Sequence, residues 1–96
     1  MKKVEIIPFP EAEIAENFEF DAVTDTGTFK FLFKWFNKRW NCWCTFPDGS
    51  VRQAGVYPNV ISWTGFTDYG LAFLTSLSEI DYNSLFLTEL CLIQWA

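Results

Sequence analysis

The sequence contains no histidine. That absence excludes catalytic triads and dyads in which a histidine acts as general base, and it excludes histidine as a metal ligand. The chain has no glycine-rich phosphate loop either. Its closely spaced carboxylates, such as Glu79 and Asp81, lie in polar segments rather than among apolar side chains. We therefore expect a protein that is not an enzyme and that binds no cofactor.

Long apolar runs and positive charge are also scarce. No run reaches the ~20 residues of a membrane-spanning helix, and the apolar stretch before Pro8 is too short for a signal peptide. Seven Lys and Arg residues against twelve Asp and Glu residues give a net charge of -5. That charge repels phosphate backbones, so we do not expect nucleic acid as a partner. We also expect no membrane as a partner and no small-molecule substrate.

Only three cysteines are present. Cys42 and Cys44 lie two residues apart, so on a strand they share a face and cannot readily form a disulfide with each other. Together with Cys91 they would supply three thiolates, whereas a structural zinc site usually has four ligands. We expect no metal site, and we interpret the cysteines as reduced, buried thiols of a protein made in a cytoplasmic compartment.

Large apolar side chains, in contrast, are abundant. Half of the 96 residues are hydrophobic. One fifth of the residues are aromatic, namely 11 Phe, 5 Trp and 3 Tyr. Such a composition excludes a disordered chain, and the length suits one domain. A core of this size holds only some of the aromatic groups, so we expect several at the surface, where apolar patches mark interaction sites.

Apolar and polar residues alternate along the first half of the chain, which predicts strands. Residues 17–22 and 29–35 follow this pattern and flank Asp25-Thr26-Gly27, so they are expected to form a hairpin. A third strand over 40–46 places Trp43 on its more polar side. The turn Pro47-Asp48-Gly49-Ser50 then leads into a fourth strand over 51–56, which completes an antiparallel meander.

The remaining strands are shorter or less regular. Val4–Ile7 predicts a strand, and residues 60–63 and 71–77 predict two more. Residues 85–95 predict a long final strand, which needs cover on both sides because both of its faces are apolar. We therefore predict an all-β fold with about six or seven strands, either a small antiparallel β-barrel or a β-sandwich. Residues 1–96 form one domain in this interpretation, with 1–16 as an N-terminal strand and acidic arm.

One stretch of the chain is similar to a known family. The order Trp35-Phe36-Asn37-Lys38-Arg39, then Trp40-Asn41-Cys42-Trp43-Cys44-Thr45-Phe46, then Pro47-Asp48-Gly49 resembles the small baseplate plug proteins of contractile-tailed, myovirus-like bacteriophages. The later strand 71–77, the acidic loop around Asp81 and a closing strand that ends near Trp95 continue the resemblance, which covers residues 17–95.

The resemblance implies a non-enzymatic structural component of the virion. Such a protein would be made in the host cytoplasm and would lie in the tail baseplate, where it plugs or bridges the hub and the tail tube near the spike. Its expected partners are other baseplate and tail-tube proteins and several symmetry-related copies of itself. As contact positions we predict five aromatic residues, because interfaces favour such side chains. They are Trp43, Tyr57, Trp63, Phe66 and Tyr82.

Two other functions fit the composition. The acidic charge and small size suit an inhibitor or immunity-type protein that binds and blocks one basic partner. Exposed tryptophans on a strand face also suit carbohydrate binding, with Trp43 or Trp63 as the stacking platform.

Overall fold

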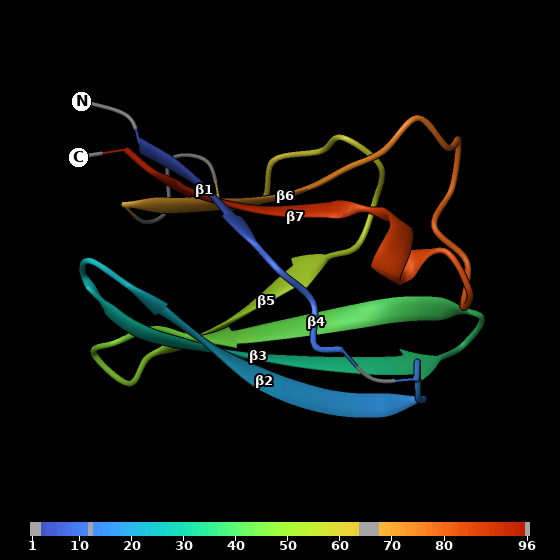
Figure 1. The fold of residues 1–96 in the computed structure, drawn as a ribbon, viewed down its shortest axis with the longest axis horizontal. Helices are drawn as coiled ribbons and strands as arrows, with labels where there is room; N and C mark the ends of the chain where they lie inside the picture. The colour runs from blue at the N-terminus through green and yellow to red at the C-terminus, as the bar shows by residue number, and fades with distance from the viewer. Residues whose placement is uncertain (1–2, 12, 64–67, 96) are drawn as a thin grey trace.

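The computed structural model describes residues 3–11, 13–63 and 68–95, which form seven strands and one short 3-10 helix (Figure 1). The predicted meander is confirmed as a four-stranded antiparallel sheet in the order β2-β3-β4-β5. Its strands are β2 (Asn17–Thr24), β3 (Gly27–Phe36), β4 (Arg39–Thr45) and β5 (Val51–Gly55).

Two tight turns fix the register of this sheet. Asn37 and Lys38 connect β3 to β4, and their φ angles of 56° and 60° are those that a type I′ hairpin turn requires. Gly27, at the start of β3, has a φ of +133°, and a Cβ atom there would lie 2.8 Å from the Cβ of Pro47. Glycine is therefore needed at this position for both its backbone conformation and its small size.

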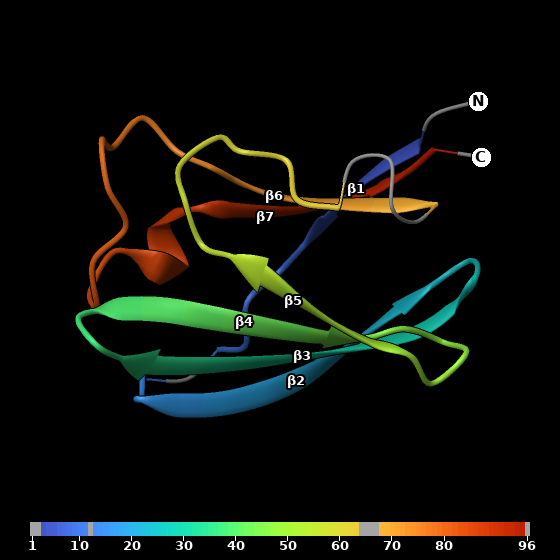
Figure 2. The same ribbon diagram turned by 180° about the vertical axis from the view of Figure 1, so that it is seen from behind.

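A second antiparallel sheet has the order β1-β7-β6 and joins the two ends of the chain. Its strands are β1 (Lys3–Ile7), β7 (Glu89–Gln94) and β6 (Tyr69–Leu74). Figures 1 and 2 show this sheet packed over the four-stranded sheet. The all-β prediction is confirmed, and of its two alternatives the sandwich fits, because the two sheets do not close into a barrel.

Two strand predictions in the second half are wrong. The segment predicted over 60–63 contributes one isolated bridge, between Ser62 and Leu71. Asn59, directly before the segment, and Trp63, its last residue, have φ angles of 60° and 69°, and these left-handed residues interrupt an extended strand.

The long strand predicted over 85–95 is instead a 3-10 turn, η1 (Leu85–Leu87), followed by β7. Side-chain hydrogen bonds compete locally with the extended conformation. The backbone N–H of Ser84 donates to the Asp81 carboxylate over 3.0 Å, and the Thr88 hydroxyl donates to the carbonyl of Leu85 over 2.8 Å.

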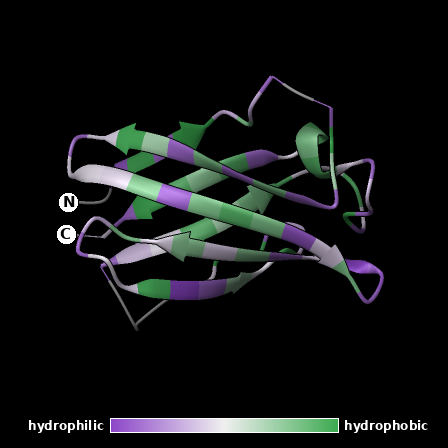
Figure 3. Cartoon of the chain, turned by 90° about the horizontal axis from the view of Figure 1, so that it is seen from below, coloured by the Kyte–Doolittle hydropathy of each residue, from purple (hydrophilic) through white to green (hydrophobic). Residues whose placement is uncertain are grey.

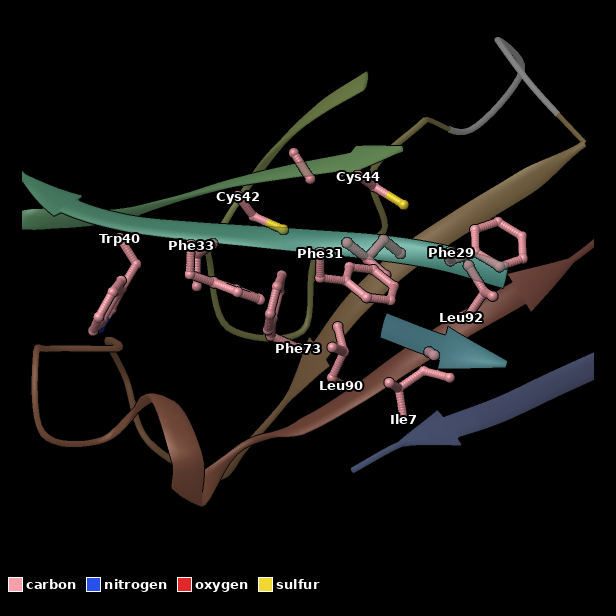
Figure 4. Close-up of a cluster of buried hydrophobic side chains, with 14 of the residues drawn as sticks. Ile7, Phe29, Phe31, Phe33, Trp40, Cys42, Cys44, Phe73, Leu90 and Leu92 are labelled. Atoms are coloured by element: carbon pink, nitrogen blue, oxygen red, sulfur yellow. The ribbon is translucent and has the colours of Figure 1, made fainter. Parts of the chain in front are cut away.

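The core lies between the two sheets and follows the predicted alternation. Phe29, Phe31 and Phe33 project from β3 toward the second sheet and have no solvent exposure (Figure 4). The other core residues with no exposure come from β4, β6, β7 and the η1 turn; they are Cys42, Cys44, Leu71, Phe73, Leu85, Leu90 and Leu92.

Phe33 and Phe36 on the same strand provide a matched test of this packing. Phe33 is fully buried, and its ring centroid lies 5.1 Å from that of Phe18 and 5.9 Å from that of Phe73. We expect Phe33→Ala to lower the free energy of unfolding in urea by about 3–5 kcal/mol. Phe36 is 51% exposed, so Phe36→Ala should cost less than about 1 kcal/mol. Equal losses would contradict the assigned facing of β3.

Candidate functional site

The outer face of the three-stranded sheet is apolar over nearly its whole width. Leu90 and Leu92 of β7 point into the core, so Cys91 and Ile93 point outward. The register places outward residues of β1 and β6 beside them in the same rows. We call this surface the outer apolar face; it comprises Val4, Ile6, Gly70, Ala72, Leu74, Cys91 and Ile93.

The centre of the outer apolar face is covered and its rim is open. Cys91 and Ile93 are buried, whereas Val4 and Ile6 of β1 are 52% and 63% exposed. At Gly70, an added Cβ would lie 3.1 Å from a methyl group of Ile61 and 3.2 Å from the Trp95 ring. The chain therefore covers the β6 side of the final strand itself around Gly70 and Ala72, and it leaves the β1 side and Leu74 at the end of β6 to solvent.

Charge protects the edge of β1 while its face stays apolar. Lys3 forms an ion pair with Glu5 over 3.0 Å and a second one with Asp25 at the tip of the β2–β3 hairpin. Charged side chains on a short edge strand oppose pairing with the edge of another chain. A partner of this sheet is therefore expected to pack on its face rather than extend it by a further strand.

The outer face of the four-stranded sheet is more polar. Hydrophilic and hydrophobic bands alternate along its strands in Figure 3, which views the molecule from this side. A groove of about 380 Å³, which we call the Trp43 groove, lies on this face. Its lining residues come mainly from β3 and β4; they are Glu19, Lys30, Leu32, Lys34, Trp43, Thr45 and Val51.

Tyr57, another predicted contact residue, lies in a separate groove. Its side chain is 50% exposed, and its hydroxyl accepts a hydrogen bond from the Arg39 guanidinium over 3.3 Å. The groove measures about 230 Å³ and also includes Lys38, Glu79 and Ile80 in its lining. Trp43 and Tyr57 therefore belong to two surfaces and do not form one patch.

Two further predicted contact residues pack against the core. The Trp63 ring lies edge-on to Phe46 with a centroid distance of 5.3 Å, and its Nε1 donates to the Gln53 carbonyl over 2.9 Å. Tyr82 stacks on Trp40 at a centroid distance of 5.5 Å. Phe66, the last predicted contact position, lies outside the described residues.

Sequence reasoning missed the aliphatic contribution to the surface. Among the described residues, the large hydrophobic side chains classed as exposed include only two aromatic ones, Phe36 and Tyr57. Val4 and Ile6 were assigned to a strand, but their face was not recognised. Their alternation with Lys3 and Glu5 could have shown that two apolar residues share one side of that strand.

The three cysteines are free thiols in apolar surroundings. Burial raises the pKa of the Cys42 thiol well above its ordinary value and raises the pKa of Cys44 to about 12. Burial also raises the pKa of Cys91. Each thiol is therefore held in its protonated form, which is neither the nucleophile nor the metal ligand. In the part of the chain that the structure describes, no three Cys, Asp or Glu side chains cluster as a metal site would require.

Comparison of the chain with protein-family models, with curated proteins and with solved structures finds no match. Within residues 3–11, 13–63 and 68–95, no helix has the length and apolar character needed to cross a membrane.

The raised pKa values of Cys42 and Cys44 predict a loss of stability in alkali. Below pH 9 both thiols keep their protons in the folded and unfolded states, whereas above pH 9 the unfolded chain releases them first. We expect the free energy of unfolding to fall by about 1 kcal/mol per thiol between pH 8 and pH 10. Urea unfolding of the wild type and of Cys42→Ala/Cys44→Ala measures this. If the free energy of unfolding of the variant fell with pH as steeply as that of the wild type, the loss could not be attributed to these two thiols.

Proposed function

We propose that this chain is a non-enzymatic structural component of a phage tail baseplate that plugs or bridges the hub and the tail tube near the spike. The observation that carries this proposal is the outer apolar face, whose β1 rim is exposed at Val4 and Ile6. Burial of apolar surface contributes about 25 cal/mol per Å². A partner that covers this rim would therefore gain stability without any charged contact.

The charged edge of β1 supports assembly through sheet faces rather than through strand edges. Since the charges of Lys3 and Glu5 oppose open-ended strand pairing, neighbouring subunits would meet face to face. Such contacts suit other baseplate and tail-tube proteins and several copies of this chain, because closed symmetry buries a repeated patch without forming fibres. The proposal also agrees with the family resemblance of residues 35–49.

A second candidate function is a small acidic inhibitor or immunity-type protein. The net charge of -5 and the exposed carboxylates of Glu11, Glu13 and Glu16 favour a basic partner. The two functions differ in their response to salt. Binding through the carboxylates weakens as ionic strength rises, whereas packing on the outer apolar face does not.

Quantitative mass spectrometry of purified virions or contractile particles from the source tests the proposed location. We expect the chain at a fixed, low copy number relative to the tail-tube protein, because a baseplate holds a set number of subunits. Detection only in the cytosol of producing cells would contradict the baseplate function and would favour the inhibitor.

Ile6→Glu tests whether the outer apolar face carries assembly. Ile6 is 63% exposed, so the charge should change the free energy of unfolding by less than about 1 kcal/mol. Incorporation into particles should fall at least about tenfold, because the partner would have to bury an unpaired carboxylate. Val23→Glu is the control, since Val23 is 82% exposed on β2 of the other sheet. Equal incorporation of the two variants would contradict the proposed interface.

A further inference from the structure

The Trp43 groove lies in the middle of the four-stranded sheet, over β3 and β4. Both strands have a neighbour on each side in the order β2-β3-β4-β5. Their backbone N–H and C=O groups are therefore used within the sheet, and a peptide cannot bind here as an added strand. Recognition in this groove depends on side chains.

The side chains of the groove combine an aromatic surface with polar groups of both hydrogen-bonding kinds. Trp43 is half-buried and Leu32 lies opposite it in the sheet register, so they supply an apolar floor. The Lys30 and Lys34 ammonium groups offer hydrogen-bond donors to a ligand, and the Glu19 carboxylate offers acceptors. A sugar ring matches this mixture, because it has an apolar C–H surface and hydroxyl groups that both donate and accept.

The lysines lie on both sides of this apolar floor. Lys30 and Lys34 are four residues apart on β3, which separates their Cα atoms by about 13 Å, with Leu32 between them. The Lys34 ammonium lies 5.9 Å from the centroid of the Trp43 ring, within the range of a cation–π contact. A ligand seated against the indole would thus have an ammonium group near each end.

Charge distinguishes the class of saccharide. The lining has two ammonium groups against one carboxylate, on a protein whose net charge is -5. Among the described residues, the ion pairs are those of Lys3, and neither Lys30 nor Lys34 has a carboxylate within 4.0 Å. These two ammonium groups favour a ligand that carries a carboxylate or a sulfate.

The other anionic ligands fit less well. A nucleic acid carries a phosphate at every nucleotide along a chain longer than this groove, so most of its charge would lie beyond the two lysines, against a protein whose net charge is -5. The volume of about 380 Å³ falls within the ~300–1,000 Å³ of small-ligand sites. Trp63, the other tryptophan considered for stacking, uses its ring against Phe46 and its Nε1 on Gln53.

We infer that the Trp43 groove is a binding site for an acidic saccharide. The indole of Trp43 packs against a sugar ring, Lys30 and Lys34 bind its anionic groups, and Glu19 accepts hydrogen bonds from its hydroxyls. This activity is separate from the proposed assembly function, because the groove and the outer apolar face lie on different sheets.

Titration of the full chain, followed by two-dimensional ¹H–¹⁵N NMR, tests the inference. The probes are short oligogalacturonate and its neutral counterpart, oligogalactose. We expect shifts confined to β3, β4 and the Trp43 indole, with dissociation constants at least about fivefold lower for the acidic probe. No saturable shift with oligogalacturonate would overturn the inference, as would equal affinity for both probes. Tighter binding of single-stranded DNA or of an acidic peptide would overturn the saccharide assignment.

Substitutions separate the aromatic contribution from the charged one. Trp43→Ala should weaken oligogalacturonate binding at least about tenfold, and Trp43→Phe should retain part of it if the aromatic face matters. Lys34→Ala should reduce the preference for the acidic probe. Lys38→Ala is its matched control, because Lys38 is an exposed lysine outside the Trp43 groove. Wild-type binding by Trp43→Ala, or equal effects of the two lysine variants, would overturn the inference.

Discussion

The alternation of side chains along β3 is the constraint on which the two layers of this domain depend. It sends Phe29, Phe31 and Phe33 into the core and leaves Lys30 and Lys34 on the opposite face. A slip of one residue in the pairing of β3 would exchange these two sets. The two-residue turn between β3 and β4 opposes such a slip, because the pairing of Phe36 with Arg39 leaves no slack in the hairpin.

The interior uses most of the aromatic surplus. Phe18 stacks on Phe33 at a centroid distance of 5.1 Å, and Trp40 stacks on Tyr82. Trp40 also donates its Nε1 to the Asp81 carbonyl over 3.1 Å. These contacts attach the loop before η1 to the four-stranded sheet, so one aromatic cluster stabilises both that sheet and the connection from β6 to η1 of the other sheet. The exposed rim on β1 is therefore formed by aliphatic groups such as Ile6, although the composition had predicted aromatic contact residues at the surface.

The first half of the chain could be predicted from the sequence more fully than the second, in which only the strands β6 and β7 were found, with different bounds. Between residues 17 and 56 each strand follows its predecessor through a short turn, so local alternation and turn residues specify the meander. In the second half, β7 pairs with β1, over 80 residues away along the chain. No local pattern encodes that pairing. The 3-10 turn at Leu85–Leu87 could not be predicted either, because its apolar residues also suit a strand.

The two candidate surfaces likewise combine features that local sequence predicts with features that depend on segments far apart in the chain. That the final strand is apolar on both faces could be predicted, but which side the chain covers itself depends on the loop that carries Ile61. Trp43 was placed correctly on the polar side of its strand. The groove around it also needs Lys30 and Lys34 from β3, and these three residues meet only through the register of the sheet.

The two outer faces of the sandwich differ in chemistry, and this difference bears on how the protein can act. One face is apolar with a charged edge at Lys3, and the other places two lysines beside an indole. Packed sheets lie about 10 Å apart, so substitutions on the two faces are far enough apart to act additively. A partner on the outer apolar face would leave the Trp43 groove open, and one copy of the chain could therefore hold a protein neighbour and a second ligand at the same time.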